Sequence, residues 1–330
     1  MNVLILGATG FIGGHIARAA LDHGWHVRGL RRRPNAVGAI GDVASQIEWV
    51  QGELPFQSTA VLQDLKGLSP AMRGCAVVFH SAAAYPHAER DLAGWVSRSV
   101  TQIRAVLQAA SAARVSRFVY TSTLTTIGFP GESGRQADER DFYVPGTSRS
   151  IYYEAKFAME MEVFRAAAEG LPAVILNPTA VFGPGDIKPT TGEVLLRVAR
   201  GQIPVYFDAV VNCVDVRDMA AAHVSAAERG RAGQRYILGG HNLALQEVLT
   251  TTAQVAGVQP PRWKLSARTV DAVIRVGDWL RLPLPDLVKT IRHWQPVDSE
   301  RARRELGLKA RPFRDTAHDT IAWFREQHYV

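Results

Sequence analysis

The sequence has few cysteines, no basic leader and no long apolar run. Cys75 and Cys213 are the only cysteines in 330 residues, so they cannot build a disulfide framework, and no Cys/His spacing suggests a metal site. The opening MNVLILGATG holds a short apolar run without a basic region before it, unlike a signal peptide. No stretch reaches the roughly 20 apolar residues that a transmembrane helix needs. We therefore expect a soluble, cytoplasmic protein without a metal.

The chain also lacks a basic patch of the kind that binds nucleic acid. Its net charge is +7, but most arginines are dispersed. The two dense groups, at 31–33 and 301–304, are not interleaved with stacking aromatic residues, so no nucleic-acid partner is expected. Association with a membrane surface rests only on the charge and on AVIRVGDWLRLPLPDLVKTI (272–291), which fits core helices equally well.

What the chain does have is a regular alternation of strands and helices. Apolar runs predict strands at 2–6, 25–30, 47–52, 75–80, 117–122 and 172–178, and helical spacing predicts helices at 11–23, 92–112 and 150–169. Continuous apolar strands that alternate with helices are typical of a parallel sheet covered on both faces. The sequence therefore predicts an α/β, doubly wound Rossmann fold.

The pattern loosens after residue 178, where a loop rich in glycine and proline follows. Later strands near NCVDV and at RYILGG are expected to rejoin the parallel sheet. We therefore predict a dinucleotide-binding domain made of residues 1–178 and 212–239. A smaller, discontinuous and mainly helical substrate-binding domain would comprise residues 179–211 and 240–330.

A glycine-rich turn joins the first strand to the first helix. In GATGFIGG, Gly7 permits the tight turn, Gly10 lets the backbone approach a pyrophosphate, and Gly13 lets helix and strand pack closely. The amides at the start of the helix would face the phosphates. A glycine triplet alone is weak evidence, but the strand before it and the helix after it make this one a strong dinucleotide signal.

The end of the second strand carries arginines where NAD-binding proteins carry an acid. Arg31 stands at the position where an acidic side chain would bind the ribose 2′-hydroxyl, and Arg32 and Arg33 follow it. Guanidinium groups suit a 2′-phosphate through charge-assisted, forked hydrogen bonds. We therefore expect NADP(H), with NAD(H) less favoured; a solvated basic turn is the alternative. Glu53, after the third strand, is a plausible adenine contact.

The stretch YYEAK holds two tyrosines at helical distance from a lysine. Tyr152 and Tyr153 both share a helix face with Lys156, so the spacing alone leaves open which tyrosine works with the lysine. A neighbouring ammonium favours the phenolate and lowers the tyrosine pKa from its usual value of about 10, which suits proton transfer. The alternative is an aromatic helix face with a solvated lysine.

These motifs make the chain resemble the extended short-chain dehydrogenase/reductases, in the NAD(P)-dependent epimerase/dehydratase family, over nearly its whole length. The resemblance is carried by GATGFIGG, VFHSAA, VYTST, YYEAK, NPTAVFGPGD and RYILGG, and it is greatest to the dihydroflavonol-reductase-like and hopanoid-associated epimerase-like members. The family's Y-x-x-x-K falls on Tyr152 and Lys156 and leaves Tyr153 as packing or pocket wall. The family's catalytic hydroxyl, usually a serine, falls on Thr123.

The resemblance also implies where the cofactor lies. The segment after the fourth strand would contact the ribose and pyrophosphate, and the segment after the sixth would contact the nicotinamide carboxamide. The expected cofactor-binding residues are Gly7, Thr9, Gly10, Phe11, Ile12, Gly13, Arg31, Arg32, Glu53, Leu54, Ser81, Ala82, Ala83, Thr121, Tyr152, Lys156, Asn177, Pro178, Thr179 and Val181. Family members are often homodimers through the helices predicted at 92–112 and 150–169, so a homodimer is expected.

The chain departs from the sugar-nucleotide members of the family in one motif. Those members carry RDxxHVxD, whose arginine pairs with the substrate diphosphate. Here the stretch is VNCVDVRD, with Val211 in place of the arginine and Asp215 in place of the histidine. A valine cannot bind a diphosphate. A pocket lined by aromatic residues would suit a bulky hydrophobic substrate; the candidates are Phe129, Tyr143, Phe182, Tyr206, Phe207 and several tryptophans, some of which could instead belong to the core.

These features favour an NADP(H)-dependent oxidoreductase that interconverts a ketone or aldehyde and an alcohol, with Thr123, Tyr152 and Lys156 as catalytic residues. One alternative is an epimerase or dehydratase, which tends to hold NAD tightly. An alternative of another class is a non-catalytic dinucleotide sensor; such proteins typically lose the tyrosine and the lysine, which this chain keeps.

Overall fold

The computed structural model describes residues 1–54, 68–86, 89–132, 134–148, 150–266, 268–270, 272 and 294–330. The segment considered above for contact with a membrane surface therefore lies, apart from residue 272, outside the described residues. Within the described ranges, no helix is both long enough and apolar enough to cross a membrane.

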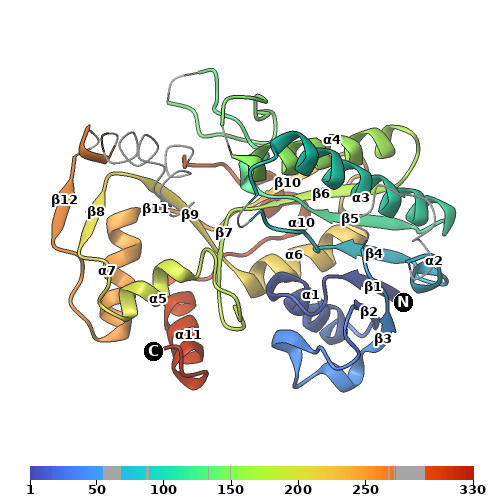
Figure 1. Ribbon diagram of the computed structural model, residues 1–330, viewed down its shortest axis with the longest axis horizontal. Coiled ribbons are helices and arrows are strands. Elements are labelled where there is room, and N and C mark those ends of the chain that lie inside the picture. Colours follow the sequence, from blue (N-terminus) through green and yellow to red (C-terminus); the bar gives the residue numbers. More distant parts are fainter. Residues whose placement is uncertain are drawn as a thin grey trace.

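A seven-stranded parallel sheet forms the larger part of the molecule (Figure 1). Its strands lie in the order β10-β6-β5-β4-β1-β2-β3, with β1 (Asn2–Leu6) near the centre. The others are β2 (His26–Arg31), β3 (Glu48–Gln51), β4 (Val77–His80), β5 (Arg117–Thr121), β6 (Ala173–Pro178) and β10 (Arg235–Leu238). All neighbouring pairs run parallel. The doubly wound Rossmann fold is confirmed.

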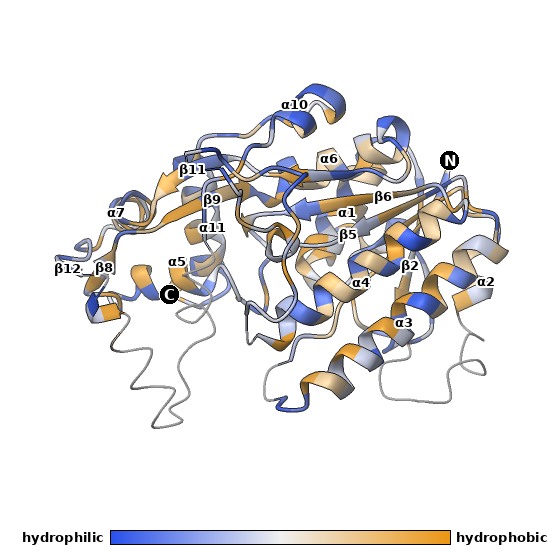
Figure 2. Ribbon diagram, turned by 90° about the horizontal axis from the view of Figure 1, so that it is seen from above, coloured by the Kyte–Doolittle hydropathy of each residue, from blue (hydrophilic) through white to orange (hydrophobic). Residues whose placement is uncertain are grey.

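Alternate residues along the strands pack into two separate hydrophobic cores, one on each face of the sheet. Val3 and Ile5 of β1 pack with α1 (Phe11–Asp22) and α6 (Val216–Arg229) on one face of the sheet. Leu4 and Leu6 pack on the other face with α2 (Leu68–Met72), α3 (Leu92–Ala112) and α4 (Ile151–Ala168). Strand β6 carries a long hydrophobic stretch in Figure 2, whereas α3 and α4 also carry hydrophilic residues. This double coverage is why the strands read as continuous apolar runs in the sequence.

The second part of the molecule contains small sheets as well as helices. Strands β7 (Ala180–Phe182), β9 (Val210–Asp215) and β11 (His241–Ala244) form one sheet, and β8 (Val205–Phe207) pairs with β12 (Trp263–Leu265). Helices α5 (Glu193–Ala199), α7 (Leu245–Ala256) and α11 (Phe313–Glu326) share a third core with them. The short α10 (Glu300–Leu306) lies against α6 and β10. Short 3-10 turns lie at Gly38–Ile40, Ala44–Gln46 and Leu124–Thr126.

One strand prediction is confirmed and one is wrong. RYIL rejoins the parallel sheet as β10, beside β6. The NCVDV strand does not, because β9 pairs with β7 and β11 instead. Val211 and Cys213 of β9 face the third core, whereas Val214 packs on the core of the large sheet. An apolar run shows that a strand is buried on both faces, but not in which sheet. The division at residues 178, 212 and 239 stays a prediction.

Candidate active site

The glycine turn has the geometry that a dinucleotide needs. Gly7 has φ +98°, a region where other residues are strained. A Cβ on Gly13 would lie 2.1 Å from the carbonyl oxygen of Gly7, so the turn and α1 pack too closely for any side chain. Gly10 is the N-cap of α1 and supplies no side-chain hydrogen bond to its amides. These residues fit a pyrophosphate at the helix N-terminus.

The segments predicted to surround the cofactor lie next to this turn. A Cβ on Gly7 would lie 2.9 Å from the backbone nitrogen of Ala82, and Ser81 donates its hydroxyl to the carbonyl of Leu6 at 3.0 Å. Phe11 and Ile12 form the first turn of α1. Gly38 approaches so closely that a Cβ would lie 1.9 Å from the carbonyl oxygen of Thr9. The loop after β2 is thereby folded onto the glycine turn.

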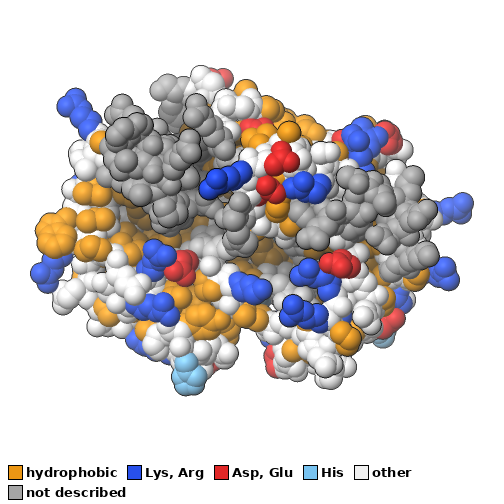
Figure 3. All heavy atoms as spheres, viewed as in Figure 1, with side chains coloured by type: hydrophobic (Ala, Val, Ile, Leu, Met, Phe, Trp, Pro, Cys, Tyr) orange, Lys and Arg blue, Asp and Glu red, His pale blue; other side chains and the backbone are white. Residues whose placement is uncertain are grey.

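The arginines at the end of β2 are held by neighbouring side chains. The guanidinium of Arg31 lies over the ring of Trp49 in β3, 4.9 Å from its centroid. Arg32 pairs with Glu53 at 3.4 Å, and both side chains are mostly exposed. A stacked, partly exposed guanidinium keeps its donors available for an anion. Leu54 follows Glu53 and packs on the second core. On the face shown in Figure 3, Lys and Arg side chains are spread among apolar and acidic ones.

Lys156 lies buried beneath the carboxyl end of β5. Its Nζ donates to the carbonyl oxygen of Thr121 at 3.1 Å and lies 3.4 Å from the hydroxyl of Tyr120. Burial lowers the pKa of this ammonium to about 8, although the carboxylate of Glu160 acts in the opposite direction. The Thr121 side chain itself turns away and hydrogen-bonds Nε2 of His223 at 3.0 Å.

Tyr152 and Thr123 meet at the wall of the site. Tyr152 lies one helical turn before Lys156, and its side chain lies beside that of Thr123. Burial raises the pKa of the phenol, and the neighbouring Thr123 hydroxyl opposes the rise. The ring of Tyr85 lies 5.1 Å from that of Tyr152, centroid to centroid. Tyr153 instead packs its ring 5.7 Å from that of Tyr143, in surroundings that also raise its pKa.

A cavity of about 870 Å³ opens in front of Tyr152 and Thr123. It lies between the carboxyl edge of the large sheet and the second part of the molecule. Its lining is largely apolar and includes Ile127, Phe129, Phe142, Tyr143, Val144, Tyr153, Ala180, Val194, Ile203, Val210, Val211 and Trp294. Its volume is in the range of cavities that bind drug-sized molecules.

The predicted pocket residues divide between this cavity and the core. Phe129 and Tyr143 line the cavity. The prediction is wrong for Phe182, Tyr206 and Phe207, which pack in or against the third core. Phe182 of β7 packs on Phe313 of α11, and β8, which carries the other two residues, contacts α7.

The two residues that differ from the sugar-nucleotide motif also have different surroundings. Val211 lines the cavity. Asp215 does not; it caps α6 by accepting a hydrogen bond from the amide of Arg217 at 2.8 Å. The Val211 side chain can therefore contact a molecule in the cavity, whereas Asp215 stabilises the start of α6.

The predicted site residues at the end of β6 and directly after it also have different surroundings. Thr179 lines the cavity. Asn177 turns its amide toward β5 and donates to the carbonyl of Thr123 at 3.1 Å. Pro178 is the last residue of β6, and Val181 packs in the core of the large sheet. Ala83 lies exposed in the loop after β4.

Three residues near the site escaped the sequence analysis. Tyr85 gave no signal, because a lone tyrosine in a loop has no pattern. Glu160 follows Lys156 by four residues on the same helix, and its full burial could have been suspected from that spacing. Arg235 is a charged residue within an otherwise apolar strand, and such a residue needs a buried partner.

The comparisons with known proteins agree with this geometry. A family model described as NAD dependent epimerase/dehydratase family matches residues 3–239. The chain is 34% identical to a Synechocystis protein provisionally named dihydroflavonol 4-reductase, over 99% of this chain and 95% of the relative. It is 29% identical to sterol demethylase protein B of Methylococcus capsulatus over the full length of both. A nucleoside-diphosphate-sugar epimerase from Pseudomonas aeruginosa, 27% identical, superimposes with a TM-score of 0.84 over 100% of this chain and 99% of that one.

Proposed function

From the premise that the chain belongs to the NAD dependent epimerase/dehydratase family, we propose that it is an NADP(H)-dependent oxidoreductase that interconverts a ketone or aldehyde and an alcohol on a bulky, hydrophobic small molecule. The family match and the relatives named as reductases make the chain an NAD(P)-dependent enzyme of the extended short-chain dehydrogenase/reductase type. The observation that carries the finer proposal is the position of Tyr152 and Thr123 on the wall of a largely apolar cavity, with Lys156 buried one turn behind.

In this proposal Tyr152 is the general acid and base. The bound nicotinamide supplies or accepts a hydride at the substrate carbon. In the direction of reduction, Tyr152 gives its phenol proton to the carbonyl oxygen, which becomes the hydroxyl of the alcohol. The Thr123 hydroxyl hydrogen-bonds that oxygen and orients it. The Lys156 ammonium, one helical turn away, would favour the phenolate that remains. Burial raises the pKa of the phenol, and the neighbouring Thr123 hydroxyl opposes that rise.

The preference for NADP(H) rests on the end of β2. Arg31 and Arg32 stand where an acid would bind the 2′-hydroxyl of NAD, and the stacking on Trp49 holds the Arg31 guanidinium in place. The pairing of Arg32 with Glu53 is exposed on both sides and therefore weak, so a phosphate can compete for the arginine. In this arrangement Glu53 orients Arg32 in addition to any adenine contact.

The hydrophobic substrate class rests on the cavity lining. Among the described residues that line it, Arg197 is the sole cation, and its Nε donates to Glu193 at 2.8 Å. The carboxylate of Glu193 also lines the cavity and offsets this single positive charge, and Val211 occupies the wall. The relatives named for a dihydroflavonol and a sterol agree with a flat, largely apolar substrate. The epimerase with a similar structure keeps a sugar-nucleotide substrate as the second candidate.

The cofactor and the substrate class can be tested together. We would denature the purified protein to identify any retained nucleotide, then titrate the emptied protein with NADPH and NADH. Turnover would then be measured with a dihydroflavonol, a keto-sterol and UDP-glucose. Little retained nucleotide, tighter binding of NADPH and reduction of either apolar ketone are expected. Tightly retained NAD together with conversion of UDP-glucose would overturn the proposal in favour of an epimerase.

A further inference from the structure

A buried ion pair lies directly behind the wall that carries Thr123. Glu160 of α4 and Arg235 of β10 have side chains that are 0% and 2% exposed, and Oε1 lies 2.8 Å from Nη1. Desolvation makes such a pair a poor source of stability, and apolar replacements of similar volume are often neutral or stabilising. A contribution to stability therefore does not explain well why the chain has this pair. The other contacts of the two residues lie toward the active site.

The carboxylate of Glu160 organises the loop that presents Thr123. Its Oε2 accepts hydrogen bonds from the hydroxyl of Ser122, from Nδ2 of Asn177 at 2.8 Å, and lies 2.7 Å from Oγ1 of Thr126. Nδ2 of Asn177 and Oγ1 of Thr126 also lie 3.1 Å and 2.9 Å from the carbonyl oxygen of Thr123. The backbone of Thr123 is thus held by two groups that Glu160 itself holds.

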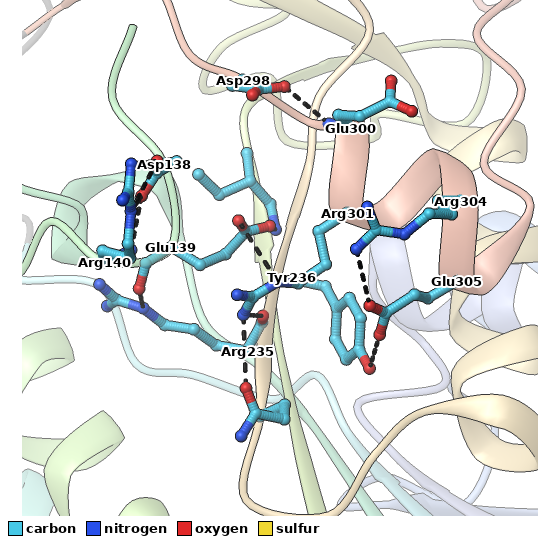
Figure 4. A network of polar contacts seen from close by, with 12 residues as sticks. Asp138, Glu139, Arg140, Arg235, Tyr236, Asp298, Glu300, Arg301, Arg304 and Glu305 are labelled. Atoms are coloured by element: carbon cyan, nitrogen blue, oxygen red, sulfur yellow. Dashed lines mark hydrogen bonds and ion pairs between the residues drawn. The ribbon is translucent and has the colours of Figure 1, made fainter. Parts of the chain in front are cut away.

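The guanidinium of Arg235 fixes the loop on the far side of the cavity. Its Nε donates to the carbonyl of Glu139 at 3.0 Å, and its Nη2 donates to the carbonyl of Asp141 at 2.8 Å. Its Cζ atom lies over the ring of Phe142, 3.8 Å from the ring centroid, and Phe142 lines the cavity. Figure 4 shows Arg235 reaching Glu139 while the next residue, Tyr236, points to the opposite side of β10 toward Glu305.

We propose that the Glu160–Arg235 pair positions Thr123 and the Phe142 wall against Tyr152, and supplies the negative charge that holds the Lys156 ammonium in its buried place. Both are positioning residues, since neither lines the cavity. This inference rests on the proposed function, because it assigns the pair to the reaction in which Tyr152 and Lys156 take part.

The electrostatic part follows from what surrounds Lys156. Tyr152 and Glu160 lie on its own helix, Tyr120 faces it from β5, and His80 acts on it from β4. Burial raises the pKa of the phenol of Tyr120 and lowers that of His80 to about 3, so both are neutral at pH 7. Glu160 is the one carboxylate in this set, and it is the group that opposes the loss of the lysine proton.

The test compares the double variant Glu160→Gln/Arg235→Met with Asp215→Asn. The double variant removes both charges of the Glu160–Arg235 pair, so that neither partner is left buried without the other. Asp215 is an equally buried carboxylate, paired with Arg217 at 2.8 Å at the start of α6, away from the cavity. The chain has only six lysines, so a lysine-selective NMR titration can assign Lys156 by its absence in Lys156→Met. Turnover is measured with NADPH and whichever apolar ketone the wild type reduces fastest.

In the double variant we expect the pKa of Lys156 to fall by about half a unit or more. We expect kcat to fall at least tenfold, with the dissociation constant of NADPH unchanged. Arg235→Lys should keep the pKa of Lys156 while lowering kcat and speeding amide exchange at residues 124–143, because it keeps the charge and loses the forked contacts. Asp215→Asn should lower thermal stability and leave the other readouts unchanged.

An unchanged lysine pKa and kcat in the double variant would overturn the inference and leave the pair a structural one. If the double variant does not fold, the Arg235→Lys variant tests the inference in its place. A normal kcat and a normal rate of amide exchange at 124–143 in that variant would also overturn the inference. The lysine titration requires no cofactor or substrate. A wild type that binds no NADPH would therefore defeat the proposed function while the pKa comparison still decides the electrostatic part of the inference.

Discussion

Tyr152 and Tyr153 are neighbours in the chain, yet α4 places their rings in different surroundings. Tyr152 lies beside Thr123 and the ring of Tyr85, whereas Tyr153 packs on Tyr143. Tyr152→Phe should therefore lower kcat for ketone reduction at least about 100-fold, since it removes the general acid, and should change NADPH binding far less, since the ring remains. Tyr153→Phe, the matched control, should change kcat only a few-fold. Equal losses in both variants, measured by NADPH oxidation, would show that the site was assigned to the wrong tyrosine.

The buried ammonium of Lys156 should cost stability in a way that depends on pH. Its pKa in the folded protein is about 8 against 10.5 in the unfolded chain, so between these values the unfolded chain binds more protons. The free energy of unfolding of the wild type should therefore rise with pH over that range.

Relative to Lys156→Met, the gain should total about 3 kcal/mol between pH 8 and pH 10.5, from the size of the pKa shift. Denaturant unfolding of both proteins across this range measures the difference. Other groups that titrate in both proteins, including the buried tyrosines, contribute equally to both free energies of unfolding and cancel in the difference. A difference that stays flat with pH would mean that the lysine keeps its ordinary pKa.

At the scale of elements, β2 and β3 together hold the guanidinium of Arg31 in place. Trp49 of β3 supports Arg31 of β2, because these adjacent parallel strands bring the two residues together. Arg31→Ala should weaken NADPH binding about 10- to 100-fold, the range of one or two charge-assisted hydrogen bonds, and change NADH binding less than twofold. Arg33→Ala, an exposed neighbour, is the control. Equal weakening of both cofactors, measured by fluorescence titration, would contradict the assignment of Arg31 to the 2′-phosphate.

The same scale shows where pattern-based prediction succeeds. The helix predicted at 92–112 coincides with α3, whose N-cap Asp91 accepts a hydrogen bond from the amide of Gly94 at 2.9 Å. The strands of the large sheet were predicted within two residues at each end, because all except the edge strand β3 are largely buried and bounded by turns. The three aromatic residues of β7 and β8 were misassigned to the pocket, since hydrophobicity alone does not distinguish a cavity wall from a core.

At the scale of the whole molecule, we propose a homodimer through α3 and α4. These two helices pack side by side on one face of the sheet, and Arg104 of α3 pairs with Glu162 of α4 at 2.7 Å. Light scattering coupled to gel filtration should give a mass about twice the 36.1 kDa of the chain at micromolar concentration. A mass of 36.1 kDa that does not change with concentration would reject the dimer.

The sequence by itself determined the strands of the large sheet, the helices at 11–22, 92–112 and 151–168, the glycine turn and the helical spacing of Tyr152 and Lys156. These are encoded locally, in hydrophobic period, glycine placement and helical spacing. Only the tertiary structure decided which tyrosine meets Thr123, which sheet receives β9, and which aromatic residues line the cavity. It also joined Glu160 to Arg235 across 75 residues of chain. Such contacts depend on how separate elements pack, and the periodicity within one element carries no information about its partner.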